Sequence, residues 1–389
     1  MSIQPNVLQT LAPVQTIQAE SLSDAPSPGI ALCLSGGGYR AMLFHLGTLW
    51  RLNELGYLPK LDRISSVSGG SITAGALGLL WSKLQFNASG VAANFDETVA
   101  ARIRGLAGHT VDTVSILSGV LGPGSVGDKV EQAYRRYVFG NATLQDLPDR
   151  PRFVINSTNV QSMVLWRFSK PYMRDYRVGE VRNPTVPLAV AVAASSAFPP
   201  FLSPVVLKLK ESEFTPGSGE DLQRPPFTTE VVLTDGGVYD NLGLETAWKR
   251  YDTVLVSDAG GAYQPESDPK RDWAQHSYRV FNLIDNQVRA LRKRQVIASF
   301  KEGIRKGAYW GIRSNIADFR LPDALPCPFD KSTAIAKTAT RLKALEAPAQ
   351  QRLINWGYAV CDAAMRKHVD PSLTAPAGFP YPAEGVGQI

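Results

Sequence analysis

The sequence predicts an α/β fold with a mainly parallel central sheet and helices on both faces of that sheet. The first observation is that short apolar runs alternate along the chain with longer segments whose apolar residues recur at helical spacing. The second is that several of these runs stop at glycine-rich turns, where a buried strand feeds the next helix. Strands that alternate with helices in this way are typical of a parallel sheet.

Two strand–turn–helix units open this pattern. Residues 30–34 predict a buried strand that stops at the turn 35–38, and a helical pattern follows over 39–55. A second strand at 63–67 runs into a turn that carries Ser68, and another helix follows it. Residues 1–29 are polar with scattered prolines, and we expect them to form an extended arm.

The segment 85–150 lacks clear strands, and we interpret it as a helical insertion over the site. Its helical patterns, which glycines interrupt, are 95–106, 113–121 and 128–139. Two strands and an apolar helix follow, at 152–158, 164–168 and 188–197. Residues 210–228 are polar and rich in proline, and we expect a surface loop.

Two later strands each end in an aspartate that glycines follow. They are 230–234, before Asp235, and 253–257, before Asp258. The remaining predicted helices are 242–250, 277–300, 334–346 and 349–367. In the helix 277–300 the apolar residues Val280, Ile284, Val288 and Leu291 lie on one stripe.

The expected domain organisation has three parts. The arm 1–29 precedes a catalytic domain over 30–262, and a helical C-terminal region over 263–389 packs on that domain. The chain has 389 residues, which is long for one domain.

The composition is that of an ordinary globular protein, with 44% hydrophobic and 20% charged residues. No stretch approaches the roughly 18 apolar residues of a membrane span, and residues 1–29 hold no basic residue for a secretory signal. We therefore expect a cytoplasmic protein that works at the inner face of the membrane. The net charge of +6 suits an anionic surface, either lipid or nucleic acid. Cys33, Cys327 and Cys361 have no metal-ligand spacing, so neither a metal nor a cofactor is expected.

Ser68 lies where a strand turns sharply into a helix, which is the position of the serine in a nucleophile elbow. The usual pattern is Gly-x-Ser-x-Gly, because the turn is crowded. Here Gly70 occupies the last position, and Ser66, another small residue, replaces the first glycine. A serine turn by itself is a weak signal, since Ser-Gly-Gly-Ser also occurs in ordinary loops.

The glycine turn Gly36-Gly37-Gly38 strengthens this interpretation. Glycines between a strand and a helix leave backbone N–H groups that point at one place, where they can hold an oxyanion or a phosphate. The dinucleotide-binding pattern fits poorly, because Ala41 replaces its last glycine and the nearest acid, Glu54, lies inside the helix.

Asp235 is the predicted acid partner of the serine. It ends a strand before Gly236 and Gly237, which favours an exposed carboxylate at the edge of the sheet where α/β folds bind ligands. Asp258 has a similar setting and is the alternative.

The order of three motifs resembles the patatin-like phospholipases of the bacterial type. The motifs are Gly-Gly-Gly-x-Arg at 36–40, the serine elbow, and Asp-Gly-Gly at 235–237, within a resemblance that spans about 30–261. The segment 194–199 (Ala-Ser-Ser-Ala-Phe-Pro) is also similar to one that such proteins often carry before the aspartate.

The resemblance implies a lipid acyl hydrolase that cleaves fatty acyl esters of membrane phospholipids with a Ser–Asp dyad. By position, Ser68 is the nucleophile and Asp235 the base. The oxyanion hole is implied at the amides of Gly36, Gly37 and Gly38. The residues that support the motifs are Arg40, Ser66, Gly69, Gly70, Gly236 and Gly237.

The resemblance also bears on partners. It implies membrane phospholipid as the substrate and peripheral contact with the membrane, with no nucleic acid partner. Some bacterial members of similar size are antiviral effectors that cyclic nucleotides switch on, so a small anionic activator is a further hypothesis. Residues 113–121 predict either a lid that touches lipid or a helix packed on the core. The basic cluster Arg289, Arg292, Lys293 and Arg294 predicts a solvated face or a contact with anionic groups.

Two other functions stay open at this point. One is an α/β-hydrolase-type esterase with a Ser–His–Asp triad, for which only His276 and His368 follow Asp235 in the chain. Neither follows a strand end or a glycine turn, so the dyad is favoured, and His45 is expected to pack rather than react. The other is a non-catalytic protein that binds phosphate or a nucleotide at the loop 36–38, which would need no serine hydroxyl.

Overall fold

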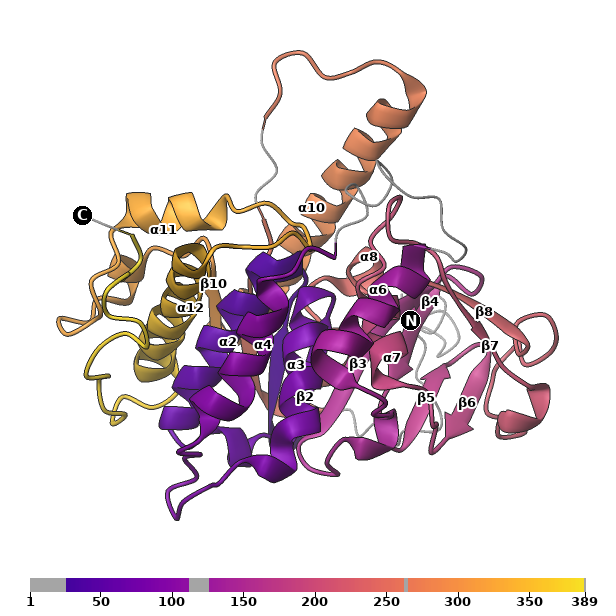
Figure 1. Cartoon of the computed structure of the whole chain (residues 1–389), viewed down its shortest axis with the longest axis horizontal. Helices are drawn as coiled ribbons and strands as arrows, with labels where there is room; N and C mark the ends of the chain where they lie inside the picture. Colours follow the sequence, from indigo (N-terminus) through magenta and orange to yellow (C-terminus); the bar gives the residue numbers. More distant parts are fainter. Residues whose placement is uncertain (1–25, 112–125, 262–264, 388–389) are drawn as a thin grey trace, which may run out of the picture.

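The structure is a computed structural model, and it describes residues 26–111, 126–261 and 265–387. The described residues form a ten-stranded sheet in the order β10-β9-β1-β2-β3-β4-β5-β6, with β8 pairing β3 and β7 pairing β8 (Figure 1). The strands are β1 (Ser27–Leu34), β2 (Arg63–Val67), β3 (Arg152–Asn159), β4 (Val164–Phe168), β5 (Tyr172–Asp175), β6 (Gly179–Arg182), β7 (Val205–Lys208), β8 (Glu230–Asp235), β9 (Tyr251–Asp258) and β10 (Lys306–Gly311).

The central strands β10, β9, β1, β2 and β3 are parallel to their neighbours. Beyond β3 the sheet continues through β4, β5 and β6, each antiparallel to its neighbour. Strand β8 also pairs antiparallel with β3, and β7 pairs antiparallel with β8. The predicted α/β fold with a mainly parallel central sheet is therefore confirmed.

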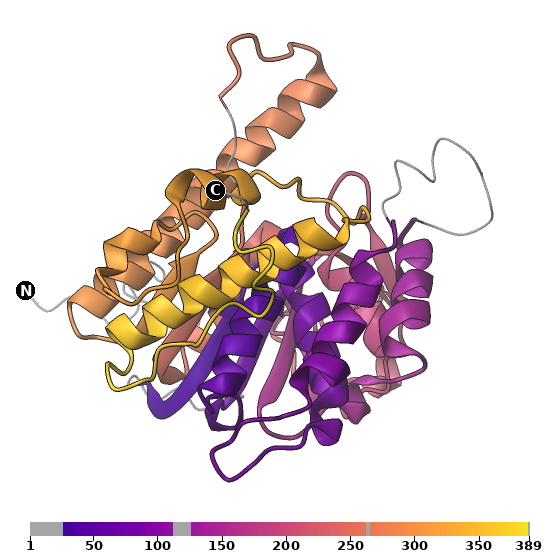
Figure 2. The same ribbon diagram turned by 60° about the vertical axis from the view of Figure 1, so that its left-hand side comes forward.

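The α-helices lie around this sheet (Figures 1 and 2). They are α2 (Gly38–Glu54), α3 (Gly69–Leu80), α4 (Ala101–Ala107), α6 (Val126–Tyr134), α7 (Leu188–Ser195), α8 (Gly237–Asp240), α9 (Glu245–Trp248), α10 (Trp273–Lys301), α11 (Phe329–Ala336) and α12 (Ala347–His368). Short 3₁₀ and π segments are η1 (Leu58–Lys60), η2 (Trp81–Lys83), η3 (Asp96–Ala100), η4 (Arg135–Phe139), η5 (Leu144–Asp146), η6 (Glu211–Glu213) and η7 (Ile316–Phe319).

Strand β1 shows how the sheet divides the core into two layers. Its side chains alternate between the two faces, as in any strand. Leu32 and Leu34 enter the larger cluster, to which α2, α3 and α12 contribute. Ala31 and Cys33 enter a smaller cluster on the other face with residues of β9 and with Val296 of α10.

Helices α2 and α12 touch backbone to backbone. A Cβ atom added at Gly47 of α2 would lie 1.9 Å from the carbonyl oxygen of Ile354, and one at Gly357 of α12 would lie 1.9 Å from that of Phe44. Since no side chain fits at such distances, glycine on each helix sets this close approach. The contact ties the C-terminal helix to the helix that begins at the glycine turn.

The structure corrects several predicted boundaries. Strands β5, β6, β7 and β10 were not predicted. The predicted helix 334–346 was wrong from 337 onward, because α11 ends at Ala336. The predicted helix 242–250 holds only the single turn of α9. The helix 113–121 lies outside the described residues, and the domain boundaries stay a prediction. In the part of the chain that the structure describes, no helix combines the length and hydropathy that crossing a membrane requires.

The contact between α2 and α12 generates a first prediction. Gly47→Ala should lower the free energy of unfolding by about 1–3 kcal/mol, since the new methyl group must push a backbone carbonyl aside. The matched control is Gly105→Ala in α4, where a Cβ would meet nothing within 4 Å. There alanine should stabilise the helix by up to about 1 kcal/mol. Urea unfolding of both variants measures this, and equal effects at the two sites would contradict the packing argument.

Candidate active site

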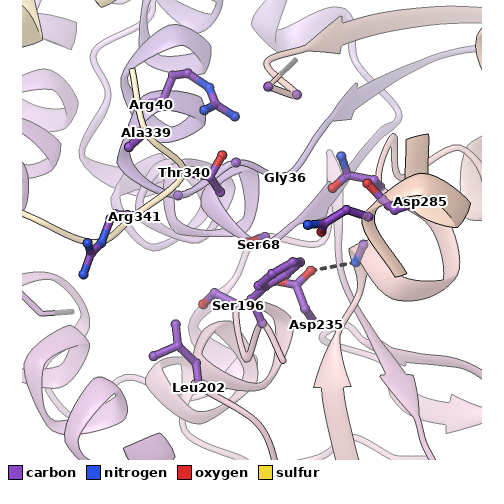
Figure 3. Close-up of a pocket in the computed structure, with 18 of the residues that line it drawn as sticks. Gly36, Arg40, Ser68, Ser196, Leu202, Asp235, Asp285, Ala339, Thr340 and Arg341 are labelled. Atoms are coloured by element: carbon purple, nitrogen blue, oxygen red, sulfur yellow. Dashed lines mark hydrogen bonds between the residues drawn. The ribbon is translucent and has the colours of Figure 1, made fainter. Parts of the chain in front are cut away.

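A cavity of about 690 Å³ opens beside the carboxyl ends of β1, β2 and β8 (Figure 3). It contains the predicted residues Ser68, Asp235 and the turn 36–38. Other lining residues come from α8, α10 and the segment 336–342. The structure thus brings the three predicted motifs into one site.

Ser68 has the strained backbone of an elbow. Its φ of 53° and ψ of −123° are unusual for a residue with a side chain. The residues after it must be glycine, because a Cβ on Gly69 would lie 2.1 Å from the carbonyl oxygen of Gly38, and one on Gly70 would lie 2.5 Å from that of Leu34. The serine turn and the glycine turn therefore pack directly against each other.

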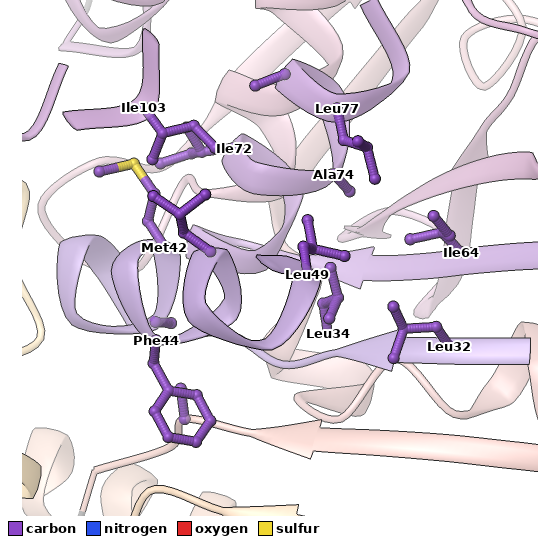
Figure 4. Close-up of a cluster of buried hydrophobic side chains, with 14 of the residues drawn as sticks. Leu32, Leu34, Met42, Phe44, Leu49, Ile64, Ile72, Ala74, Leu77 and Ile103 are labelled. Carbon is purple, nitrogen blue, oxygen red and sulfur yellow. The ribbon is translucent and has the colours of Figure 1, made fainter. Parts of the chain in front are cut away.

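A hydrophobic cluster beneath the two turns holds their helices in place (Figure 4). Met42 of α2 and Ile72 of α3 are fully buried in it, together with Leu34 of β1 and Ile64 of β2. Because both helices start at the site, packing between them fixes the distance between the two turns.

Ser195 supports the elbow from behind. Its hydroxyl accepts a hydrogen bond from the Ser68 amide at 3.0 Å and donates one to the carbonyl of Asn156 in β3 at 2.6 Å. Ser66, which replaces the glycine of the usual pattern, is fully buried, and its hydroxyl accepts a hydrogen bond from that of Ser71 at 3.0 Å. The serine at this position therefore fits the turn.

Asp235 reaches Ser68 because two strands meet end to end along β3. Strand β2 runs parallel to β3 and ends with Val67 opposite Asn156. Strand β8 runs antiparallel to β3 and ends with Asp235 opposite Ser157, the next residue. The residue after β2 and the last residue of β8 consequently come together from opposite directions.

The Asp235 carboxyl group is buried, so the expectation of an exposed carboxylate was wrong. Burial raises its pKa to about 7, and the nearby Asp285 carboxylate acts in the same direction. Two donors lower the pKa in part. They are the Gly237 amide, which donates to Oδ1 at 2.7 Å, and the Ser68 hydroxyl. Oδ2 forms no hydrogen bond of ordinary geometry within the described residues.

The amides of the glycine turn do not all have the same surroundings. The Gly36 amide donates to the Asn241 carbonyl at 3.1 Å, which is a correction to its predicted role as an oxyanion donor. Those of Gly37 and Gly38 line the cavity and have no hydrogen-bond partner among the described residues. Their φ angles, 144° and 59°, require glycine. Two of the three predicted donors thus remain available.

The Arg40 side chain stabilises this turn through hydrogen bonds to distant backbone carbonyls. Its buried guanidinium donates through Nε to the Ala259 carbonyl at 3.0 Å and through Nη1 to the Thr338 carbonyl at 2.6 Å. The Tyr39 amide likewise donates to the Arg341 carbonyl at 3.0 Å. The segment 336–342, which sequence reasoning placed in a helix, is therefore a wall of the cavity.

Asp258, the alternative acid, is held elsewhere. It accepts hydrogen bonds from the Tyr309 hydroxyl at 2.6 Å and the Gly260 amide at 2.8 Å, and Arg289 lies 3.7 Å away. Burial alone would raise its pKa, but Arg289 and Tyr309 bring it below the usual value. Asp258 is thus a paired carboxylate outside the cavity lining.

None of the four histidines, all of them in described parts of the chain, lines the cavity. His276 is exposed on α10, and His368 lies at the end of α12 against the Phe319 ring. His45 is buried, contacts the Ser257 hydroxyl and the Ser35 carbonyl at 2.9 Å each, and has its pKa lowered to about 4, chiefly by burial. His109 stacks on Tyr137.

Sequence reasoning missed Asn241 and Asp285, which also line the cavity, and it named Arg289 only in a basic cluster and not at the cavity. They belong to no motif, and only the packing of α8 and α10 beside the sheet brings them there. The described residues contain no group of three or more acidic, histidine or cysteine side chains placed to hold a metal ion. The three cysteines are buried and unpaired.

A model of the patatin-like phospholipase family matches residues 32–248. Comparison with curated protein sequences finds no match. Among solved structures, human GIVD cytosolic phospholipase A2 is similar at 12% identity and a TM-score of 0.49, over 85% of this chain and 60% of that one. VipD from Legionella pneumophila is similar at 14% identity and a TM-score of 0.34, over 86% of this chain and 66% of that one. The chain thus spans about three fifths of the human protein's length.

The opposite surroundings of the two acids generate a second prediction. With its pKa raised in the fold, Asp235 contributes stability below about pH 4 that is lost as the pH rises to about 7. Asp235→Asn should therefore be more stable than the wild type at pH 8, by on the order of 1 kcal/mol or more, and equal to it near pH 4.

Asp258→Asn is the matched control with the opposite sign. Its lowered pKa means that its stability is present at neutral pH and lost in acid. The change should destabilise the protein at pH 8 and leave Arg289 with the more distant Asp285 carboxylate, 3.9 Å away. Urea unfolding at both pH values measures the two effects, and effects of the same sign at pH 8 would contradict this account.

Proposed function

The chain belongs to the patatin-like phospholipase family, and from this we propose that it cleaves fatty acyl esters of membrane phospholipids with Ser68 as nucleophile and Asp235 as base. The observation that carries the proposal is a strained serine beside a buried aspartate in a cavity that no histidine lines, although all four histidines are described.

The proposed reaction begins with proton transfer. Ionised Asp235 accepts the proton of the Ser68 hydroxyl as Oγ attacks the acyl carbonyl carbon. A base works best when its pKa lies near the working pH, and a value of about 7 meets this condition where an ordinary aspartate would not. The protonated carboxyl then gives the proton to the oxygen of the departing lysophospholipid. Water, activated by the same carboxylate, releases the fatty acid from the acyl-enzyme.

The negative charge of each tetrahedral intermediate needs donors that are fixed in advance. The Gly37 and Gly38 amides at the start of α2 are suited to this, since the helix N-terminus also favours negative charge. The hydrogen bonds of Arg40 and the close packing of Gly38 against Gly69 fix the position of these two amides.

The cavity lining supports a substrate with one apolar and one charged part. Phe198, Phe201 and Leu202 offer apolar surface for an acyl chain. Arg341, which is exposed, also lines the cavity (Figure 3) and suits a phosphate-bearing head group. A phospholipid has this polarity, whereas a simple neutral ester has not. The antiviral role and the anionic activator stay predictions.

A third prediction tests the nucleophile. Ser68→Ala should lower hydrolysis of a phospholipid and of a p-nitrophenyl ester by about 10³-fold or more while the protein stays folded. A fluorophosphonate probe should label Ser68 in the wild type, as mapped by mass spectrometry. A folded Ser68→Ala protein with full activity would refute the dyad. It would leave phosphate binding by the glycine turn as the better explanation.

A fourth prediction tests the base. His276→Ala and His368→Ala should each keep a sizeable fraction of ester hydrolysis, because neither side chain reaches the cavity. Asp235→Asn should lose activity as Ser68→Ala does, since removal of a catalytic base costs about 10⁴-fold in turnover. Initial rates on a soluble ester compare the three variants. A collapse in either histidine variant would favour a Ser–His–Asp triad with Asp235 as its orienting acid.

A further inference from the structure

Helix α10 exposes an apolar stripe along its outer face. The side chains of Trp273, Val280, Leu283, Ile284 and Leu291 are between 41% and 82% exposed. The sequence pattern put three of them on one helical stripe, which in a globular protein normally packs on the core. Figures 1 and 2 show that the N-terminal part of α10 instead rises clear of the body of the molecule. Large apolar side chains grouped in this way mark an interaction surface.

The other side of the same helix faces the site. Tyr278, Phe281 and Asp285 line the cavity, as does Arg289. The outer stripe and the cavity are therefore separated only by the thickness of one helix.

The basic cluster predicted on this helix divides between the two sides. Arg292 lies 3.6 Å from Asp240 and 3.6 Å from Glu245, and Lys293 lies over the Tyr309 ring. With Arg289 paired to Asp258, most of the cluster attaches α10 to the sheet and to α8 and α9. Lys293 and Arg294 are both exposed, and of the two Lys293 is the one held over a ring.

Within α10 itself the charge on the outward side has one sign, and the exposed acids Asp272 and Glu302 lie just beyond its two ends. Arg294 and Lys301 are exposed. Along α10, which the structure describes throughout, the only acidic residue is Asp285, and it faces the cavity. An apolar stripe that carries only positive charge fits an anionic lipid surface. The same positive charge disfavours contact with this face of a second copy.

On the cavity side of α10, apolar surface also extends to the mouth of the cavity. Phe201 is half exposed, and its ring contacts that of Tyr278 with a centroid distance of 6.5 Å. Val238 of α8, also partly exposed, lines the same opening. A membrane that receives the outer face of α10 would therefore also meet the entrance to the site.

We infer that the outer face of α10 is the surface by which this protein docks on an anionic lipid bilayer. The apolar stripe enters the boundary between head groups and acyl chains, Arg294 contacts anionic head groups, and the cavity mouth is brought to the lipid. The inference rests on the proposed function in that the docked lipid is also the substrate.

The test is sedimentation of the full chain with vesicles of phosphatidylcholine that contain about 30% phosphatidylglycerol. The double change Ile284→Glu with Leu291→Glu should lower the partition coefficient at least about tenfold, since it puts charge into the apolar stripe. Both side chains are exposed, so folding should not change. Turnover of a soluble short-chain ester should stay within about twofold of the wild type.

The matched control is Ile304→Glu. Ile304 is 58% exposed and Ile284 is 55% exposed, so the two isoleucines differ in place rather than in exposure. Ile304 lies between α10 and the start of β10, at the edge of the sheet away from the cavity. Its replacement should leave vesicle binding unchanged.

Tryptophan fluorescence gives a second measurement. Brominated lipid should quench the protein on docking, and Trp273→Phe should remove most of that quenching, because Trp273 is 82% exposed at the tip of the stripe.

Wild-type vesicle binding by the double variant, or quenching that persists in Trp273→Phe, would overturn the inference. So would a wild-type dimer that the double variant dissociates while vesicle binding is unchanged. If the wild type binds vesicles but hydrolyses no ester, the proposed function fails and the docking surface stands.

Discussion

The site depends on one constraint, the end-to-end meeting of β2 and β8 along the same side of β3. Asn156 and Ser157 are consecutive in β3, and they pair with the ends of two strands that run in opposite directions. This places Ser68 and Asp235 side by side without any long loop. It also encloses Asp235 between strands and α7, since its amide donates to the Ala197 carbonyl at 3.0 Å. The raised pKa of Asp235 is thus a consequence of sheet topology.

Glycine makes the second half of the arrangement possible. Gly36 lies so close to the serine turn that an added Cβ would be 3.1 Å from that of Ser68, and Gly69 touches the Gly38 carbonyl in the same way. The two turns therefore form one layer of backbone, and Gly37, Gly38 and Ser68 line the same cavity. Behind it, the contact of Gly47 with α12 lets the C-terminal region reach over the turn, where residues 336–342 close the cavity.

Much of the fold and of the site could be predicted from the sequence, because a strand–turn–helix unit is recognised from a short stretch of sequence. The apolar runs before the turn 36–38 and before Ser68 predicted β1 and β2. Asp235 was predicted as the acid partner because it ends a strand before two glycines. What could not be predicted depends on contacts between distant segments. No local signal indicates that β8 is antiparallel to β3 or that the Gly36 amide donates to the Asn241 carbonyl. The same holds for the cavity wall formed by 336–342. A carboxylate at a strand end looks exposed until the strand opposite it is known.

Helix α10 illustrates why a correct helical pattern does not decide which residues are buried. The spacing of Val280, Ile284 and Leu291 was right for a helix, and a helical stripe of this kind usually faces the core. Only the part of α10 near Val296 packs on the face of the sheet, however, and Arg289 and Arg292 pair with Asp258 of β9 and the buried Asp240 of α8. Those ion pairs fix which side turns inward, so the charged side packs and the apolar side is left outside. An amphipathic helix in this orientation is stabilised only when something apolar covers it, and for a protein of this family the nearest apolar phase is the membrane that contains its proposed substrate.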